Sequence, residues 1–182
     1  HDDTGRITIP GFYDGVPELS PEMIEQWDGL KFDTTGFLDQ VGLSELAGEQ
    51  GRTALEMIWS RPTCEVNGIW GGYTGLGFKT VLPSQASAKI SFRLVGKQDP
   101  NKIRDNFRAM VQSMLPPDCS VKFKGHGSSS GSEMAIENRA FEAARVALSD
   151  EWPEAAAFVG CGGSIPIAGH FKTVLGMDAM LI

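Results

Sequence analysis

The sequence has few of the residues that build metal centres and disulfide frameworks. Its 182 residues include three histidines and three widely spaced cysteines. An odd number of cysteines without paired spacing argues against disulfides and favours reduced thiols in a cytoplasmic protein. Neither Cys-x-x-Cys nor His-x-x-x-His occurs, so we expect no metal ligands within the chain.

Clustered positive charge and long apolar runs are absent as well. The formal net charge is −7, and the lysines and arginines do not cluster, which argues against nucleic acid and acidic membrane surfaces as partners. No apolar run approaches the roughly 20 residues that span a bilayer. The chain starts at His1 rather than Met and ends in an apolar stretch, which indicates a piece of a longer protein. The absence of a signal peptide therefore says little about where the parent protein resides.

The first sixty residues predict a polar, acidic run of short helices. Ser20, Pro21 and Glu22 supply a capping hydroxyl, a proline at the first helical position and an acid near the positive end of a helix. Thr53 and Glu56 have the spacing of a capping box. These signals predict a short strand over 7–9, closed by a Pro-Gly turn, and helices over 21–28, 35–40 and 54–60.

The clearest pattern lies between residues 85 and 94. Apolar residues at even positions alternate with polar residues at odd positions, the signal of a strand with one buried and one wet face. Asp99-Pro100 then starts a helix whose apolar residues recur at intervals of three and four. Val121 and Phe123 alternate with lysines in a further strand. The order strand, strand, helix, strand favours an α+β domain, a ferredoxin-like antiparallel sheet with helices on one face.

The composition changes beyond Gly125. Residues 125–132 are rich in Gly and Ser, as in a linker. After them the pattern predicts a helix over 137–150, a strand over 157–159, a glycine turn over 160–163, a helix over 165–175 interrupted by Pro166, and a buried strand over 177–182.

Four places are candidates for binding a small substrate, and each has a purely structural alternative. Arg93 is either an exposed strand arginine or a planar fork that grips a carboxylate. His126, between two glycines, is either a solvated turn residue or a donor that faces a cleft. Gly162-Gly163-Ser164 is either a tight turn or a set of backbone amides for an anion. Thr80, on its own, reads as an ordinary β-branched strand residue.

Hydrolase chemistry based on a side-chain nucleophile is disfavoured. Ser164 has no Gly-x-Ser-x-Gly frame and no evident His/Asp partner. Cys161 has no evident base near it in the sequence. A protease reading of either residue is therefore weak.

Six segments in order carry a resemblance to a known family. They are TIPGFYD (8–14), VNGIWGGY (66–73), KTVLP (79–83), SFRLV (91–95), GHG (125–127) and GGSIP (162–166). Each is modest alone, but as an ordered set they resemble the M20 family of zinc metallopeptidases, closest to the carnosinase-like cytosolic dipeptidases.

The resemblance implies a catalytic α/β domain that holds two zinc ions, with a lid or dimerisation domain inserted into it. Residues 1–124 would be most of the lid, and residues 125–182 the returning segment of the catalytic domain. It further implies that Arg93 holds the terminal carboxylate of a dipeptide and that Thr80 reaches the active site of the other subunit in a homodimer. His126, Gly163 and Ser164 would position the peptide.

The same resemblance implies that the chain lacks catalytic residues of its own. Most of the family's metal ligands, its glutamate base and its oxyanion-stabilising histidine would lie upstream, and the last metal-binding histidine would follow Ile182. We therefore expect the isolated chain to be inactive and to bind no zinc. One departure concerns Gly160-Cys161, where the family usually has an acid, often preceded by arginine; the loss of both charges would weaken the local orientation of the turn.

Two other functions remain open on the residues alone. One is a non-catalytic dimerisation or interaction module, which the same sheet-and-helix fold would serve. The other is an RNA-binding α+β sandwich, against which the acidic charge and the lack of an aromatic RNA-binding strand motif argue.

Overall fold

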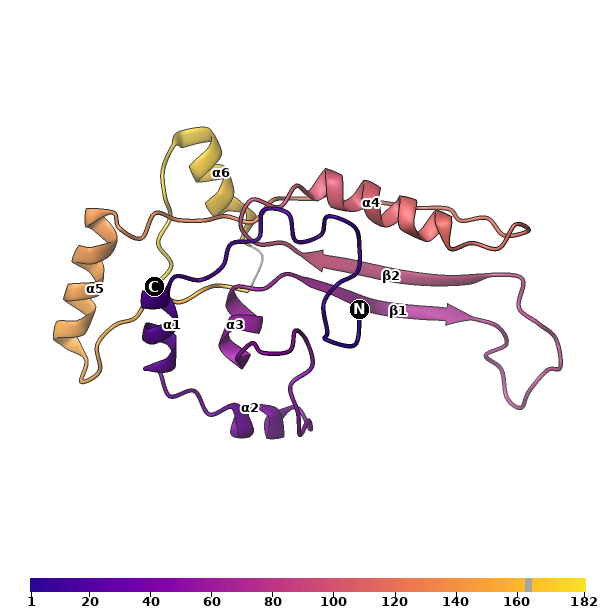
Figure 1. The fold of residues 1–182 in the computed structure, drawn as a ribbon, viewed down its shortest axis with the longest axis horizontal. Helices are drawn as coiled ribbons and strands as arrows, with labels where there is room; N and C mark the ends of the chain where they lie inside the picture. Colours follow the sequence, from indigo (N-terminus) through magenta and orange to yellow (C-terminus); the bar gives the residue numbers. More distant parts are fainter. Residues whose placement is uncertain (163–164) are drawn as a thin grey trace.

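The computed structural model describes residues 1–162 and 165–182. Over these residues the chain forms a two-stranded antiparallel sheet and helices around it (Figure 1), which confirms the predicted α+β class. The elements are α1 (Pro21–Asp28), α2 (Thr34–Gln40), α3 (Ala54–Trp59), β1 (Thr63–Gly71), β2 (Ala86–Arg93), α4 (Pro100–Ser113), α5 (Arg139–Glu151) and α6 (Pro166–Leu175). None of the described helices is both long enough and apolar enough to cross a membrane.

The strands β1 and β2 form a long hairpin. Thr63 pairs with Arg93 at its base, Gly71 pairs with Ala86 at its outer end, and the register shifts between Val66 and Gly68. The strand predicted over 85–94 is confirmed, but the expectation of one buried face is wrong for most of its length. Ala86, Ala88 and Ile90 are all exposed, so that among the described residues no element covers this face of β2 beyond its base.

The core lies at the base of the hairpin, beneath α4. Ile103 of α4 and the N-terminal residues Ile7, Ile9 and Phe12 are buried together there. Phe92 completes the contact, with ring centroids 5.8 Å from Phe12 and 5.4 Å from Phe107 of α4. The same apolar stripe that predicted α4 therefore faces this core.

The strand predicted over 7–9 is wrong, although its residues are correctly placed in the core. The Ile7 backbone amide donates to the Tyr13 hydroxyl at 3.1 Å rather than to a strand. Gln98, which is buried, donates to the Phe12 carbonyl and accepts from the Val95 amide. Side chains thus satisfy backbone groups that a ladder would otherwise pair.

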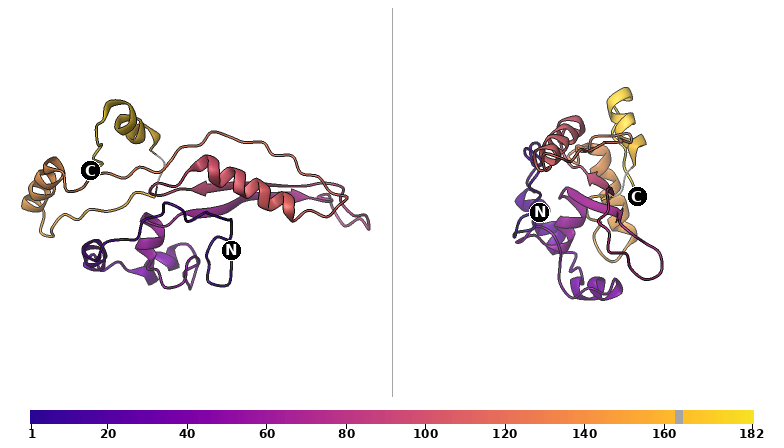
Figure 2. Two further views of the ribbon diagram at one scale, coloured as in Figure 1. Left: turned by 45° about the horizontal axis from the view of Figure 1, so that its top comes forward. Right: turned by 90° about the vertical axis from the view of Figure 1, so that its right-hand side faces the viewer.

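Three further predicted strands, over 121–123, 157–159 and 177–182, are also wrong. Each is extended chain without a ladder among the described residues. Figure 2 shows the segment after α4 running back along that helix, where the Phe123 ring lies 6.5 Å from Phe107. Phe123 alternates with lysines because one side of this segment contacts α4. The periodicity of a sequence does not distinguish such a contact from pairing with another strand.

The predicted helices are confirmed, with one correction at α6. Pro166 begins that helix instead of interrupting it, because a proline at the first position lacks only an N–H that would be unpaired there anyway. Gly176 ends it at φ 66°, in the left-handed region that suits glycine.

A charge network fixes the end of α3. Arg61 donates from Nε and Nη2 to the Glu49 carboxylate at 3.2 and 2.9 Å, and neither side chain is more than 8% exposed. Arg52 bridges Glu56 and Glu18 at 3.1 and 2.6 Å. Removing one partner of a buried pair costs about 3–5 kcal/mol, because the other charge is left uncompensated. The surface that α3 presents to the rest of the chain is therefore held in place.

Glu56 makes the stability of α3 depend on pH. Burial alone would raise the pKa of Glu56, but hydrogen bonds from Thr53 and Arg52 outweigh it, so the pKa lies below its usual 4.5. Because the folded pKa is lowered, the carboxylate stabilises the fold above pH 4.5, and this contribution is lost as the pH falls through the folded value.

We expect Glu56→Gln to lower the free energy of unfolding by about 1 kcal/mol at pH 7, since the amide replaces a charged capping group. The difference from wild type should vanish at about pH 2, where both side chains are neutral. Urea unfolding of the two proteins at both pH values measures this. An equal loss at the two pH values would contradict it.

Candidate functional site

Arg93 and Gly162 meet at the base of the hairpin. The Nη1 atom of Arg93 donates to the Gly162 carbonyl at 2.6 Å, across 69 positions of sequence. Gly162 leads directly into Gly163 and Ser164, two of the predicted binding residues, which lie outside the described residues. The structure thus brings the predicted guanidinium to the beginning of the predicted glycine turn.

The chain before Gly162 is held against α1. We name residues 156–162 the docked segment. The Phe158 amide donates to Gln26 Oε1 at 2.6 Å, and the Phe158 carbonyl accepts from Trp27 Nε1 at 2.8 Å. Two adjacent residues of α1 therefore pair both backbone groups of one residue, as a neighbouring strand would. The Ala156 amide adds a 3.0 Å hydrogen bond to Ser149 Oγ of α5.

The glycines of the docked segment lie directly on the end of α3. A Cβ on Gly160 would stand 2.6 Å from the Trp59 carbonyl oxygen, and a Cβ on Gly162 would overlap the Ile58 carbonyl oxygen. Trp59 in turn packs edge-on against Trp27, with ring centroids 5.1 Å apart. Glycine at both positions is what lets the backbone come this close to α3.

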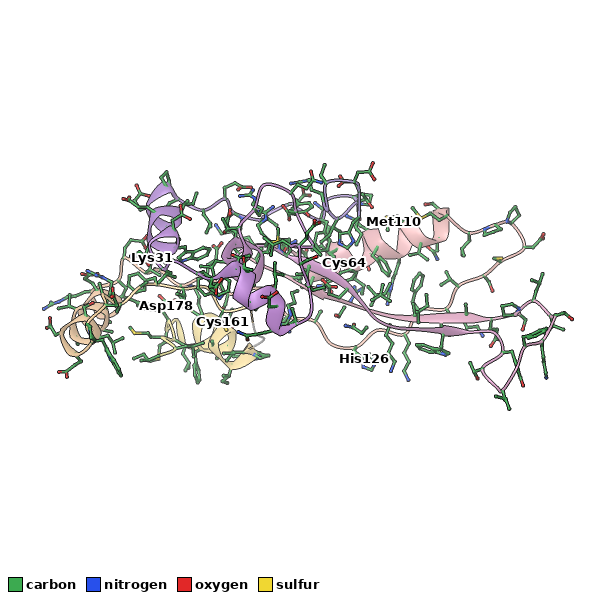
Figure 3. The ribbon with its side chains drawn as sticks, turned by 90° about the horizontal axis from the view of Figure 1, so that it is seen from below. Lys31, Cys64, Met110, His126, Cys161 and Asp178 are labelled. Carbon is green, nitrogen blue, oxygen red and sulfur yellow. The ribbon has the colours of Figure 1, made fainter. Side chains whose placement is uncertain are left out.

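His126 and Thr80 lie apart from this contact. His126 is exposed on the segment after α4. Figure 3 shows it apart from Cys161, which belongs to the docked segment. Thr80 is exposed in the loop between β1 and β2, at the far end of the hairpin (Figure 1). The eight residues of β2 separate that loop from Arg93 by about 25 Å. One copy of the chain therefore does not gather all the predicted residues in one place.

The comparison with known families identifies the family of the chain. The sequence profile of the M20 peptidase dimerisation domain matches residues 22–119, more than half of the chain. The chain belongs to this family. The M20 resemblance seen in the six ordered motifs is thereby confirmed.

Relatives of this M20 chain include metallodipeptidases. The Cys-Gly metallodipeptidase of Candida albicans is 30% identical over 184 residues, which cover 100% of this chain and 38% of the relative. The human Beta-Ala-His dipeptidase is 23% identical, over 100% of this chain and 36% of its own length. The chain thus spans little more than a third of these relatives.

A solved structure supports the same grouping. An M20 family metallo-carboxypeptidase from Sulfolobus solfataricus superimposes with a TM-score of 0.81 at 30% identity, over 96% of this chain and 45% of that one. The hairpin, α4 and the segments that follow are therefore an arrangement that an M20 peptidase also adopts.

The metal that the relatives' names imply does not fit the described residues. No group of three or more His, Cys, Asp or Glu side chains among them stands close enough to hold an ion. His126 and His170 are both exposed. We therefore assign no step of a reaction to a metal held by this M20 chain.

The sequence patterns missed the residues that hold the docked segment. Gln26 and Trp27 looked like members of an ordinary helix, and Ile58 and Trp59 like the end of another. The sequence did contain one signal for this contact, the glycines Gly160 and Gly162 with a single residue between them. Glycines in extended chain often mark a close approach of the backbone to another element.

We expect Gly162→Ala in the M20 chain to displace the docked segment, because the new methyl group overlaps the Ile58 carbonyl oxygen. The unfolding free energy should fall by about 1–3 kcal/mol, the usual cost of overpacking. Chemical denaturation measures this. Gly127→Ala is the matched control, since a Cβ there meets nothing within 4 Å. Equal stability of the two variants would contradict the contact.

Proposed function

We propose that the parent of this chain is a zinc-dependent M20 dipeptidase that hydrolyses dipeptides or small peptides in the cytoplasm. This chain would contribute substrate-carboxylate recognition and dimerisation. The observation that carries the proposal is the Arg93–Gly162 hydrogen bond, because it sets a planar cation beside the glycine turn in a relative of metallodipeptidases. The three free cysteines support a reducing compartment.

Arg93 is the residue proposed to bind the free carboxylate of the substrate. A guanidinium presents five N–H donors in a rigid fork that matches a carboxylate. The Gly162 carbonyl accepts a hydrogen bond from one of these donors, Nη1, and so restrains one end of the fork. The residue itself is exposed.

The other predicted residues keep the roles that the family resemblance implies. Residues 1–124 would form most of the lid, and residues 125–182 the returning part of the catalytic domain. His126, Gly163 and Ser164 would position the peptide. The two zinc ions would be held by residues of the parent outside this chain, so the isolated chain would be inactive.

The tip of the hairpin is proposed to contact a second copy. Leu76, Phe78 and Leu82 in the β1–β2 loop are between 89% and 102% exposed. Ile69 and Trp70, which are consecutive in β1 and so point to opposite faces, are exposed as well. Large apolar side chains exposed together at one end of a molecule are typical of interaction sites. A dipeptide spans at most about 7 Å, so Thr80 would reach the substrate of the other subunit and not that of its own.

We expect Arg93→Lys in the parent enzyme to raise KM for dipeptides by about 10–100-fold, because lysine replaces a bidentate fork with a point charge. Hydrolysis of the same dipeptides with an amidated C-terminus should change little. Steady-state kinetics with both substrates measure this. Arg104→Lys, at a partly exposed arginine of α4 paired with Asp105, is the control. An equal effect on the two substrates would refute carboxylate binding by Arg93.

We expect Leu76→Asp combined with Leu82→Asp to dissociate the dimer, because each substitution places a charge in a desolvated interface. Sedimentation of the parent protein should shift from dimer to monomer at micromolar concentration. Leu43→Asp, at a side chain 51% exposed between α2 and α3, should leave the dimer intact. A dimer that survives the double substitution would place the interface elsewhere.

A further inference from the structure

We propose that Gln26 and Trp27 are positioning residues for Arg93, which they orient through the docked segment. This inference rests on the proposed function of Arg93. The connection is continuous in the structure: α1 pairs both backbone groups of Phe158, the segment continues to Gly162, and the Gly162 carbonyl accepts from Arg93 Nη1. Neither α1 residue would touch the substrate.

The contact between Phe158 and α1 can fix the position of the docked segment as well as stabilise the fold. Trp27 is 6% exposed, and both hydrogen bonds of Phe158 are partly buried, so water competes little for them. The Phe158 ring also packs near Phe141 of α5, with centroids 6.3 Å apart. Helices on two sides therefore hold the same residue, which fixes where the segment starts its path to Gly162.

The end of α3 removes the remaining freedom between Phe158 and Gly162. Gly160 and Gly162 lie against Trp59 and Ile58 too closely for any side chain. A backbone seated in this way cannot shift towards α3, and the Phe158 hydrogen bonds prevent it from moving away. The path of the backbone to the Gly162 carbonyl is thus restricted, and with it the position of the Nη1 atom that donates to this carbonyl.

A guanidinium that is already restrained favours binding, because ordering a flexible side chain opposes it. Arginine loses rotamer freedom when it binds a carboxylate, and this loss opposes binding. A carbonyl that already orients the fork removes part of that cost before the substrate arrives. Loosening the docked segment should therefore weaken discrimination in favour of a free carboxylate more than it weakens hydrolysis in general.

The test compares Gln26→Met with Gln26→Glu in the parent enzyme. Methionine matches glutamine in length but has no acceptor for the Phe158 amide, whereas glutamate keeps a carboxylate oxygen there. Hydrogen exchange at the Phe158 amide reports the contact directly. The ratio of kcat/KM for a dipeptide to that for its C-terminal amide reports the orientation of Arg93.

Gln26→Met should accelerate exchange at Phe158 at least tenfold and lower the carboxylate-to-amide ratio about tenfold. Gln26→Glu should leave both near wild type. Glu25→Met, at an exposed position of the same helix, controls for the substitution itself. Faster exchange with an unchanged ratio would overturn the positioning role, and so would exchange that does not change at all.

The proposed function fails separately from this inference. A wild-type parent that does not hydrolyse dipeptides, or an Arg93→Lys variant that keeps the carboxylate preference, would remove the role of Arg93 itself. If Arg93→Lys lowers the carboxylate preference but Gln26→Met leaves the carboxylate-to-amide ratio of kcat/KM unchanged, only the role of α1 is refuted.

Discussion

The pairing of Phe158 with α1 is the interaction on which the arrangement of the site depends. The side chains of Gln26 and Trp27 pair the amide and the carbonyl of Phe158, in the chain between α5 and α6. The contact is made by side chains of a helix, so it fixes a segment that has no sheet to join. From this contact the chain runs on to Gly162, whose carbonyl accepts from Arg93.

The charge network around Arg61 lies next to the end of α3, which contacts the docked segment. Arg61 and Glu49 form a buried, hydrogen-bonded pair, which holds the chain just after α3. Ile58 and Trp59 lie immediately before it and form the surface that Gly162 and Gly160 touch. The buried ion pair thus stands next in the chain to the backbone of Ile58 and Trp59, against which Gly162 and Gly160 lie.

The sequence predicted helices well and strands poorly, for a physical reason. Helix signals such as Ser20 before Pro21 are local, because a cap and its helix are within one turn of each other. A strand needs a partner, and the residues around Phe123 and Phe158 have alternation or apolar character without one. Arg93 was identifiable as a candidate from its residue type and family motif, whereas its contact with Gly162 depends on elements 69 positions apart.

The length of the hairpin affects how two defective alleles would combine in one dimer. Thr80 lies in the loop beyond the outer end of β2, and Arg93 ends that strand, which is about 25 Å long. Under the proposed dimer, a substitution at the tip would therefore damage a neighbour's chemistry, while one at the base would damage its own. In a cell carrying two alleles, mixed pairs would combine these defects differently. A tip-defective and a base-defective chain together would leave one of the two sites with both residues intact.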